Sequence, residues 1–264
     1  MDKFQYYERY LNNISKKKND MDQIFLILLI SVVGPIIGSF IGVIKKPSNL
    51  FLFNLLSFSA GVMLSISFLE LIPESIALSN AYLCSIGIII GVITIYMVDK
   101  LIPHIHPELC KQEQGCKLKK TAYYLIIGIF IHNFPEGMAI AAGSAISIKS
   151  SFTIALAIAI HNIPEGICTS APLYSSSNNR LKSFLISSST AIPIIIGFFV
   201  AKVIFHNIPD YFIGMIIAST AGLMIYISAD ELIPISCNQN MKFSHSTIFS
   251  LIIGVIFVII LSSF

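Results

Sequence analysis

Two copies of a six-residue motif combine side chains that bind metal ions in proteins. His-Asn-Phe-Pro-Glu-Gly at 132–137 recurs as His-Asn-Ile-Pro-Glu-Gly at 161–166. In each copy histidine and glutamate are four residues apart, so on a helix both side chains leave the same face one turn apart. Two imidazoles, two carboxylates and two amide oxygens suit borderline metals such as Zn²⁺, Fe²⁺, Co²⁺ and Mn²⁺. The predicted metal ligands are His132, Asn133, Glu136, His161, Asn162 and Glu165.

Each motif also contains a proline and a glycine. Proline lacks an N–H donor and disrupts the preceding helical turn, so carbonyl groups among residues 129–132 and 157–161 partly lose their partners and become further candidate cation ligands. Gly137 and Gly166 let a neighbouring helix approach closely. The alternative interpretation is that asparagine and histidine only hydrogen-bond between helices around a protonated glutamate, but two tandem copies favour a metal site.

The elements that carry these motifs are expected to lie in a membrane. Of the 264 residues, 55% are hydrophobic and 12% charged, and the mean hydropathy is +0.81, which excludes an ordinary soluble enzyme. The weak, scattered net charge of +3 gives no sign of nucleic-acid binding. Because a span needs about 20 largely apolar residues, the sequence predicts an all-α polytopic membrane protein whose eight helices lie near 23–44, 50–78, 81–102, 121–147, 151–174, 183–205, 210–234 and 245–263.

The chain divides into a polar N-terminal tail, 1–22, and a transmembrane domain, 23–264. No small-residue cleavage pattern follows the first apolar segment, so we expect a retained span and not a signal peptide. The metal motifs place a binding pair of helices at 121–174, in the centre of the domain.

A second, longer repeat flanks this central pair. The segment 60–73, with Ala-Gly-Val-Met followed by Glu-Leu-Ile-Pro, matches 221–234 in one continuous register. The second helix of a first group of three thus corresponds to the second helix of a last group of three. We therefore predict a 3+2+3 arrangement with inverted repeats, a layout in which many transporters build midplane sites.

Basic residues predict the orientation. Connectors one, three, five and seven contain ten Lys and Arg residues, whereas the other connectors and their flanks contain two. The positive-inside rule places the odd connectors in the cytosol and both termini on the opposite side, in a plasma or organelle membrane. The five basic residues of the tail argue against this orientation, although nearby acids nearly balance them.

Other polar residues permit weaker predictions. The repeated second and seventh spans contain four residues that are candidates for an ion pathway: Glu70, Glu231, Ser67 and Ser228. The alternative is that these carboxylates lie at helix ends near the interface. The cytosolic loop 103–120 contains four candidates for capturing metal that leaves the pore: His104, His106, Cys110 and Cys116. Their spacing is irregular and includes no CxxC pair, so an inert loop is the alternative.

The tandem motifs resemble those of the ZIP (Zrt/Irt-like) divalent metal transporters, in the branch that includes the ZupT and GufA-type proteins. The resemblance implies an eight-helix fold, non-cytosolic termini and transport toward the cytosol. It also implies a first metal position made by His132, Glu136, His161 and Glu165. An adjacent second position would use Asn133 and Asn162, with both glutamates bridging. In this branch the sixth span usually supplies a glutamate before a proline, but here Ile192 precedes Pro193, which predicts a weakened or absent second position.

Two classes of function fit the motifs. We favour a transporter that moves Zn²⁺, or Fe²⁺, Mn²⁺ or Co²⁺, into the cytosol as substrate, with no cofactor. The sequence contains no GxxxxGK[ST] phosphate loop, so it gives no indication that the protein uses ATP directly. The alternative is an intramembrane metal-dependent hydrolase, but HExxH is absent and catalytic zinc normally has only three protein ligands. The expected partners are the metal ion and the lipid bilayer, and a homodimer is left open.

Overall fold

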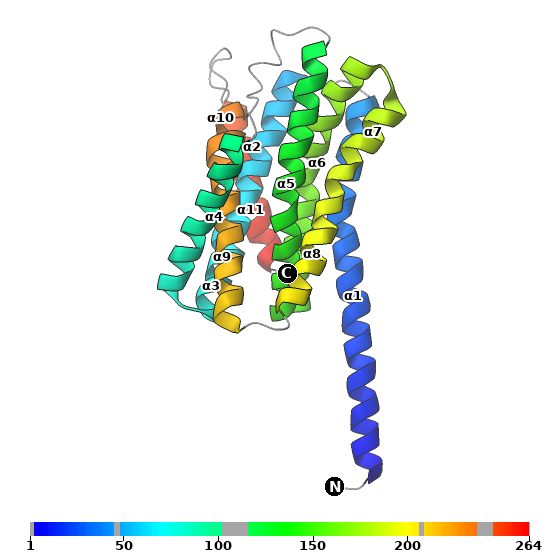
Figure 1. Ribbon diagram of the computed structural model, residues 1–264, viewed down its shortest axis with the longest axis vertical. Coiled ribbons are helices and arrows are strands. Elements are labelled where there is room, and N and C mark those ends of the chain that lie inside the picture. The colour runs from blue at the N-terminus through cyan, green and yellow to red at the C-terminus, as the bar shows by residue number, and fades with distance from the viewer. Residues whose placement is uncertain (1–2, 45–47, 102–115, 206–208, 237–244, 264) are drawn as a thin grey trace.

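The computed structural model is a bundle of helices (Figure 1). It describes residues 3–44, 48–101, 116–205, 209–236 and 245–263, which contain no β-strand. The elements up to the first metal motif are α1 (Lys3–Ile44), α2 (Asn49–Ile66), the π-helix η1 (Ser67–Leu71), α3 (Ile72–Leu78), α4 (Ala81–Leu101) and α5 (Cys116–Ile146). The remainder are α6 (Ile148–Ser177), α7 (Arg180–Ser188), the 3₁₀-helix η3 (Ser189–Ala191), α8 (Ile192–Phe205), α9 (Asp210–Ile227), the π-helix η4 (Ser228–Leu232), α10 (Ile233–Ser236) and α11 (His245–Ser263).

Within the described residues, eight helical stretches are long and apolar enough to cross a membrane, and each matches one predicted span. They are Gln23–Ile44, Phe53–Leu78, Ala81–Val98, Ile126–Ser144, Ile148–Ser177, Arg180–Ile204, Asp210–Asp230 and His245–Ser263. The all-helical, eight-span fold is therefore confirmed. The grouping of the spans into three, two and three stays a prediction.

The helices extend further than the hydropathy pattern indicated. The segment predicted as a tail is helical from Lys3, and α1 continues without a break into the first span, so that its N-terminal part projects beyond the other helices in Figure 1. Likewise α5 begins at Cys116, inside the predicted loop 103–120. Hydropathy marks only the apolar part of a helix, and residues 3–33 contain no glycine or proline that would end one.

The longer sequence repeat reappears as a repeat of local structure. The π-helices η1 and η4 begin at equivalent positions of the repeat, Ser67 and Ser228. In η1 the Ile72 N–H donates to the Ser67 carbonyl, and in η4 the Ile233 N–H donates to the Ser228 carbonyl. A proline without an N–H follows each of these isoleucines, and the wider turn accommodates it.

Glycines let the helices that surround the metal motifs pack with their backbones in contact. The central helices α5 and α6 pack against each other, α1 packs along α6, and α8 packs along α5. A Cβ atom added to Gly34 would lie 1.9 Å from the Ala159 carbonyl oxygen, and one added to Gly38 would lie 2.1 Å from the Ile163 oxygen. The α1–α6 contact was not predicted, although glycines recur every fourth residue at 34, 38 and 42, a pattern typical of close helix packing.

Candidate metal site

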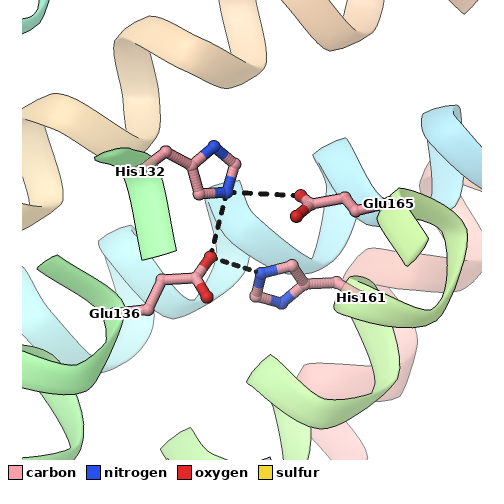
Figure 2. A group of neighbouring side chains, drawn as sticks. All are labelled: His132, Glu136, His161 and Glu165. Carbon is pink, nitrogen blue, oxygen red and sulfur yellow. Dashed lines mark hydrogen bonds and ion pairs between the residues drawn. The ribbon is translucent and has the colours of Figure 1, made fainter. Parts of the chain in front are cut away.

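Four predicted ligands meet between the central helices. His132 and Glu136 extend from α5 and His161 and Glu165 from α6, all toward one another (Figure 2). One nitrogen or oxygen atom from each side chain lies within 4.8 Å of the other three, and all four side chains are buried. The spacing of four residues within each motif accounts for this, because it keeps both ligands on the helix face that meets the partner helix.

The distances within the cluster match the size of a coordinated ion. His132 Nε2 lies 3.1 Å from Glu136 Oε1 and 3.3 Å from Glu165 Oε1, and His161 Nε2 lies 2.9 Å from Glu136 Oε1. Ligand atoms about 2.1 Å from a tetrahedral Zn²⁺ are about 3.4 Å from one another. Small side-chain adjustments would therefore bring all four ligands onto one ion.

A backbone group fixes the orientation of the His161 ring. Its Nδ1 lies 3.0 Å from the Ala157 carbonyl oxygen, which can only accept, so Nδ1 carries the hydrogen and donates it. In the neutral imidazole the lone pair is then on Nε2, the atom that faces Glu136. Metal-binding histidines commonly have such an outer-shell acceptor, because it sets both the tautomer and the ring orientation.

Several oxygens at the site are buried without a hydrogen-bond donor. Among the described residues seven side-chain polar atoms are in this condition, and four of them belong to the predicted ligands: Asn133 Oδ1, Asn162 Oδ1 and both carboxylate oxygens of Glu165. An unpartnered buried oxygen is costly, since desolvation removes its water without compensation. Four together form an acceptor-only surface that a cation would satisfy.

The two asparagines are held by their nitrogens, which leaves their oxygens free. Asn162 Nδ2 donates to Glu136 Oε2 at 2.8 Å, and Asn133 Nδ2 donates to the backbone carbonyl of Thr190 at 2.6 Å. Thr190 lies in η3, the 3₁₀ turn at the break between α7 and α8. No sequence pattern predicts this contact: Pro193 indicates a broken helical turn nearby but does not identify the partner.

Ile192, which stands where the resembled branch usually has a glutamate, lies at the surface of the bundle, and the weakened or absent second metal position stays a prediction. Its side chain is 48% exposed, whereas Thr190, two residues earlier, is buried and contacts Asn133. Position 192 therefore faces outward from the bundle, because the 3₁₀ turn before α8 directs residue 190 inward. A carboxylate at 192 on this backbone would start at the surface and not beside the asparagines.

The structure supports the predicted role of the motif glycines more fully than that of the motif prolines. Helices α5 and α6 continue through Pro135 and Pro164. Two carbonyls predicted as further cation ligands accept protein hydrogen bonds: Ala157 from His161, and His161 from Ser59 Oγ at 2.9 Å. The role of the glycines is confirmed, because a Cβ at Gly137 would lie 1.9 Å from Ile194 O and one at Gly166 would lie 2.6 Å from Pro35 O.

The weaker candidates lie apart from the four-ligand cluster or outside the described residues. The Ser67 and Ser228 hydroxyls donate to the carbonyls of Met63 and Met224 in their own helices, at 2.9 and 2.8 Å. Glu70 accepts a hydrogen bond from Ser262 Oγ at 2.6 Å. Outside the described parts of the chain lie the side chains of Glu231 and Cys116 and the whole of His104, His106 and Cys110.

Fold and site together define a polytopic α-helical membrane protein with a buried histidine and glutamate cluster suited to divalent transition metals. The family described as "ZIP Zinc transporter" matches residues 21–116 and 106–262. The chain belongs to this ZIP family.

Related proteins cover most of the chain. The zinc transporter ZupT of Escherichia coli O127:H6 (strain E2348/69 / EPEC) is 34% identical over 219 residues, which span 80% of this chain and 85% of that protein. The zinc transporter ZupT of Escherichia coli (strain K12 / DH10B) has the same identity and coverage. The resemblance noted from the tandem motifs is thereby confirmed.

Proposed function

We propose that this protein transports Zn²⁺ through the membrane into the cytosol, with the four-ligand cluster as its central binding site. The observation that supports this most directly is a set of two imidazoles and two carboxylates, buried between two spanning helices and converging within 4.8 Å. Ionisable groups inside a membrane are costly and mark ion pathways. The similarity to zinc transporters agrees with this reading of the site.

Charge favours one divalent ion as the occupant. The four ligands include two carboxylates, so with neutral imidazoles a single Zn²⁺ brings the site to neutrality. A second divalent ion would leave an uncompensated double charge in a medium of low dielectric constant, which is strongly unfavourable. The nitrogen donors favour Zn²⁺ over Mg²⁺ or Ca²⁺, while Fe²⁺, Mn²⁺ and Co²⁺ are also chemically compatible substrates.

A transporter fits the geometry better than a hydrolase. Catalytic zinc usually keeps an open position for water beside three protein ligands, whereas here four ligands surround one point. The ligands also come in two equivalent pairs, one per helix, which suits an ion that passes through more than attack on an asymmetric bond. We accordingly propose a non-enzymatic function.

The proposed entrance lies near Glu70. Glu70 and Glu74 line a small recess together with Gly143 and Ser150, next to the turn between α5 and α6. In Figure 1, α3 lies at the end of the bundle toward which the N-terminal part of α1 points, the end that the basic residues assign to the non-cytosolic side. Two carboxylates there would attract cations before they reach the buried site. The segment predicted from the sequence as a loop, 103–120, would receive the ion on the cytosolic side, partly through residues at the start of α5.

Uptake by proteoliposomes tests the proposed function. Vesicles containing the purified full chain are expected to accumulate radiolabelled Zn²⁺ in a saturable manner without ATP, and excess unlabelled Zn²⁺, but not Mg²⁺, should compete. Parallel assays with Fe²⁺ and Mn²⁺ rank the substrates. Zn²⁺ accumulation no greater than in protein-free vesicles would contradict the proposal.

The charge of the four ligands predicts how many Zn²⁺ ions bind. Calorimetric titration of the purified protein with Zn²⁺ should give one tightly bound ion per chain. Ile192→Glu should also give one, because its side chain starts from an exposed position. Two equally tight ions in the unmodified protein, or a second one created by Ile192→Glu, would show that a further group near the asparagines completes another position.

A further inference from the structure

Beside the metal site, three buried hydroxyl groups from three helices form a connected chain. Ser39 belongs to α1, Thr169 to α6 and Ser187 to α7, and none of the three is exposed. Ser187 Oγ lies 2.7 Å from Ser39 Oγ and 2.5 Å from Thr169 Oγ1. Ser187 is thus the hub that links α1 to α6, two helices that already pack along each other.

The available hydrogens give this chain a direction. Thr169 Oγ1 lies 3.0 Å from the Glu165 carbonyl and 3.1 Å from the Gly166 carbonyl, which are acceptors only. The single hydroxyl hydrogen of Thr169 is therefore donated to these carbonyls, and Ser187 donates its own hydrogen to Thr169 Oγ1. Thr169 Oγ1 is closer to Ser187 Oγ than the Gly166 carbonyl, which lies at 3.3 Å. Since the Ser187 hydrogen is used for Thr169, Ser39 donates to Ser187. The hydrogen bonds therefore run from Ser39 to Ser187, from Ser187 to Thr169, and from Thr169 to the backbone carbonyl of Glu165.

The series of hydroxyl groups ends at the backbone of Glu165, whose side chain has few interactions of its own. Its carboxylate oxygens are buried and accept no hydrogen bond from the described residues, and His132 Nε2 lies 3.3 Å from Oε1. The oxygens of Glu136, in contrast, accept a hydrogen bond from Asn162 Nδ2 and lie within 3.1 Å of the Nε2 atoms of His132 and His161. The position of Glu165 therefore depends more on the helical turn at 165–169, to which α1 and α7 are attached through the hydroxyls.

We propose that Ser187 is a positioning residue for metal binding, which acts through Thr169 on the backbone of Glu165. This inference rests on the proposed role of Glu165 as a ligand of the transported ion. Linked hydrogen bonds strengthen one another in a low-dielectric interior, so removing the hub releases both neighbours. Loss of an outer-shell partner typically lowers metal affinity by about 10–100-fold, and we expect the lower end of this range for Ser187→Ala.

Ser183 offers a matched control. It lies one turn earlier on α7 and is equally buried, but its hydroxyl donates to the Asn179 carbonyl and contacts Ser177. The Zn²⁺ dissociation constant is measured for both alanine variants, together with the melting temperature without metal. We expect Ser187→Ala to raise the dissociation constant about tenfold and Ser183→Ala to change it less than about twofold, even where both lower the melting temperature.

A double-mutant cycle tests the route. Thr169→Val keeps the side-chain shape and removes the last hydroxyl of the series. It should therefore weaken Zn²⁺ binding as much as Ser187→Ala does, and the double variant should bind Zn²⁺ no more weakly than either single variant. Unchanged affinity in folded Ser187→Ala, an equal loss in Ser183→Ala, or additive effects of Ser187→Ala and Thr169→Val would overturn the inference. Absence of Zn²⁺ binding in the unmodified protein would instead refute the proposed function.

Discussion

Replacing Glu136 with alanine is expected to reduce Zn²⁺ uptake by more than about 100-fold, since losing a ligand should exceed the 10–100-fold cost of losing an outer-shell partner. Glu136 is the centre of the site: His132 Nε2, His161 Nε2 and Asn162 Nδ2 all lie within 3.1 Å of its oxygens. The same substitution should therefore also destabilise the metal-free protein, because at least one buried donor, Asn162 Nδ2, loses its acceptor.

Glu165→Ala is the matched comparison, because both glutamates are buried and both variants delete the same atoms. Uptake should be lost as severely as in Glu136→Ala. The metal-free Glu165→Ala protein should nevertheless be more stable than Glu136→Ala by about 1–3 kcal/mol, because Glu165 accepts no hydrogen bond from the described residues and its contact with His132 Nε2 is longer, at 3.3 Å. Radiolabelled uptake and metal-free melting temperatures measure both effects, with the amount in the membrane determined by blotting. Near-normal uptake in either well-expressed variant would remove the cluster from the transport mechanism.

Gly137→Ala is expected to have the second large effect, even though it adds a single methyl group. The new Cβ would lie 1.9 Å from the Ile194 carbonyl oxygen and 2.8 Å from the Phe198 nitrogen. Both atoms are backbone atoms of α8, so neither can rotate away and the helices must separate. Overpacking of this kind typically costs about 1–3 kcal/mol. Because Glu136 is the preceding residue, the shift should also reduce Zn²⁺ uptake, by at least about tenfold.

Gly128→Ala is the control on the same helix, because no atom of the described residues outside its own helical turn and chain neighbours lies within 4 Å of its added Cβ. Alanine favours a helix over glycine by up to about 1 kcal/mol, so this variant should be as stable as the parent or slightly more stable, with normal uptake. Melting temperatures and uptake are compared for the two variants. A Gly137→Ala protein that matched Gly128→Ala in both measurements would mean that α5 and α8 are not in backbone contact.

The sequence predicted the ligands more completely than the interactions that hold them. Histidine and glutamate four residues apart must share a face of any helix, and eight apolar segments of sufficient length must cross a bilayer. Both results follow from neighbours within a turn or from the solvent alone. Each copy of the repeat, 60–73 and 221–234, likewise contains a π-helix at the equivalent position, because the same local sequence with proline at the same place produces the same local strain.

Tertiary structure decided the rest, since it depends on which distant segments become neighbours. Asn133 is bound by the Thr190 carbonyl, 57 residues away, and Ser39 contacts Ser187 across 148 residues. No pattern within one helix specifies either partner. The outward direction of Ile192 also depended on the 3₁₀ turn that precedes it. The sequence alone determined which side chains form the candidate metal cluster and that they lie in spanning helices, whereas the packing of α1, α7 and α8 around α5 and α6 decided which of their oxygens lack a hydrogen-bond donor among the described residues.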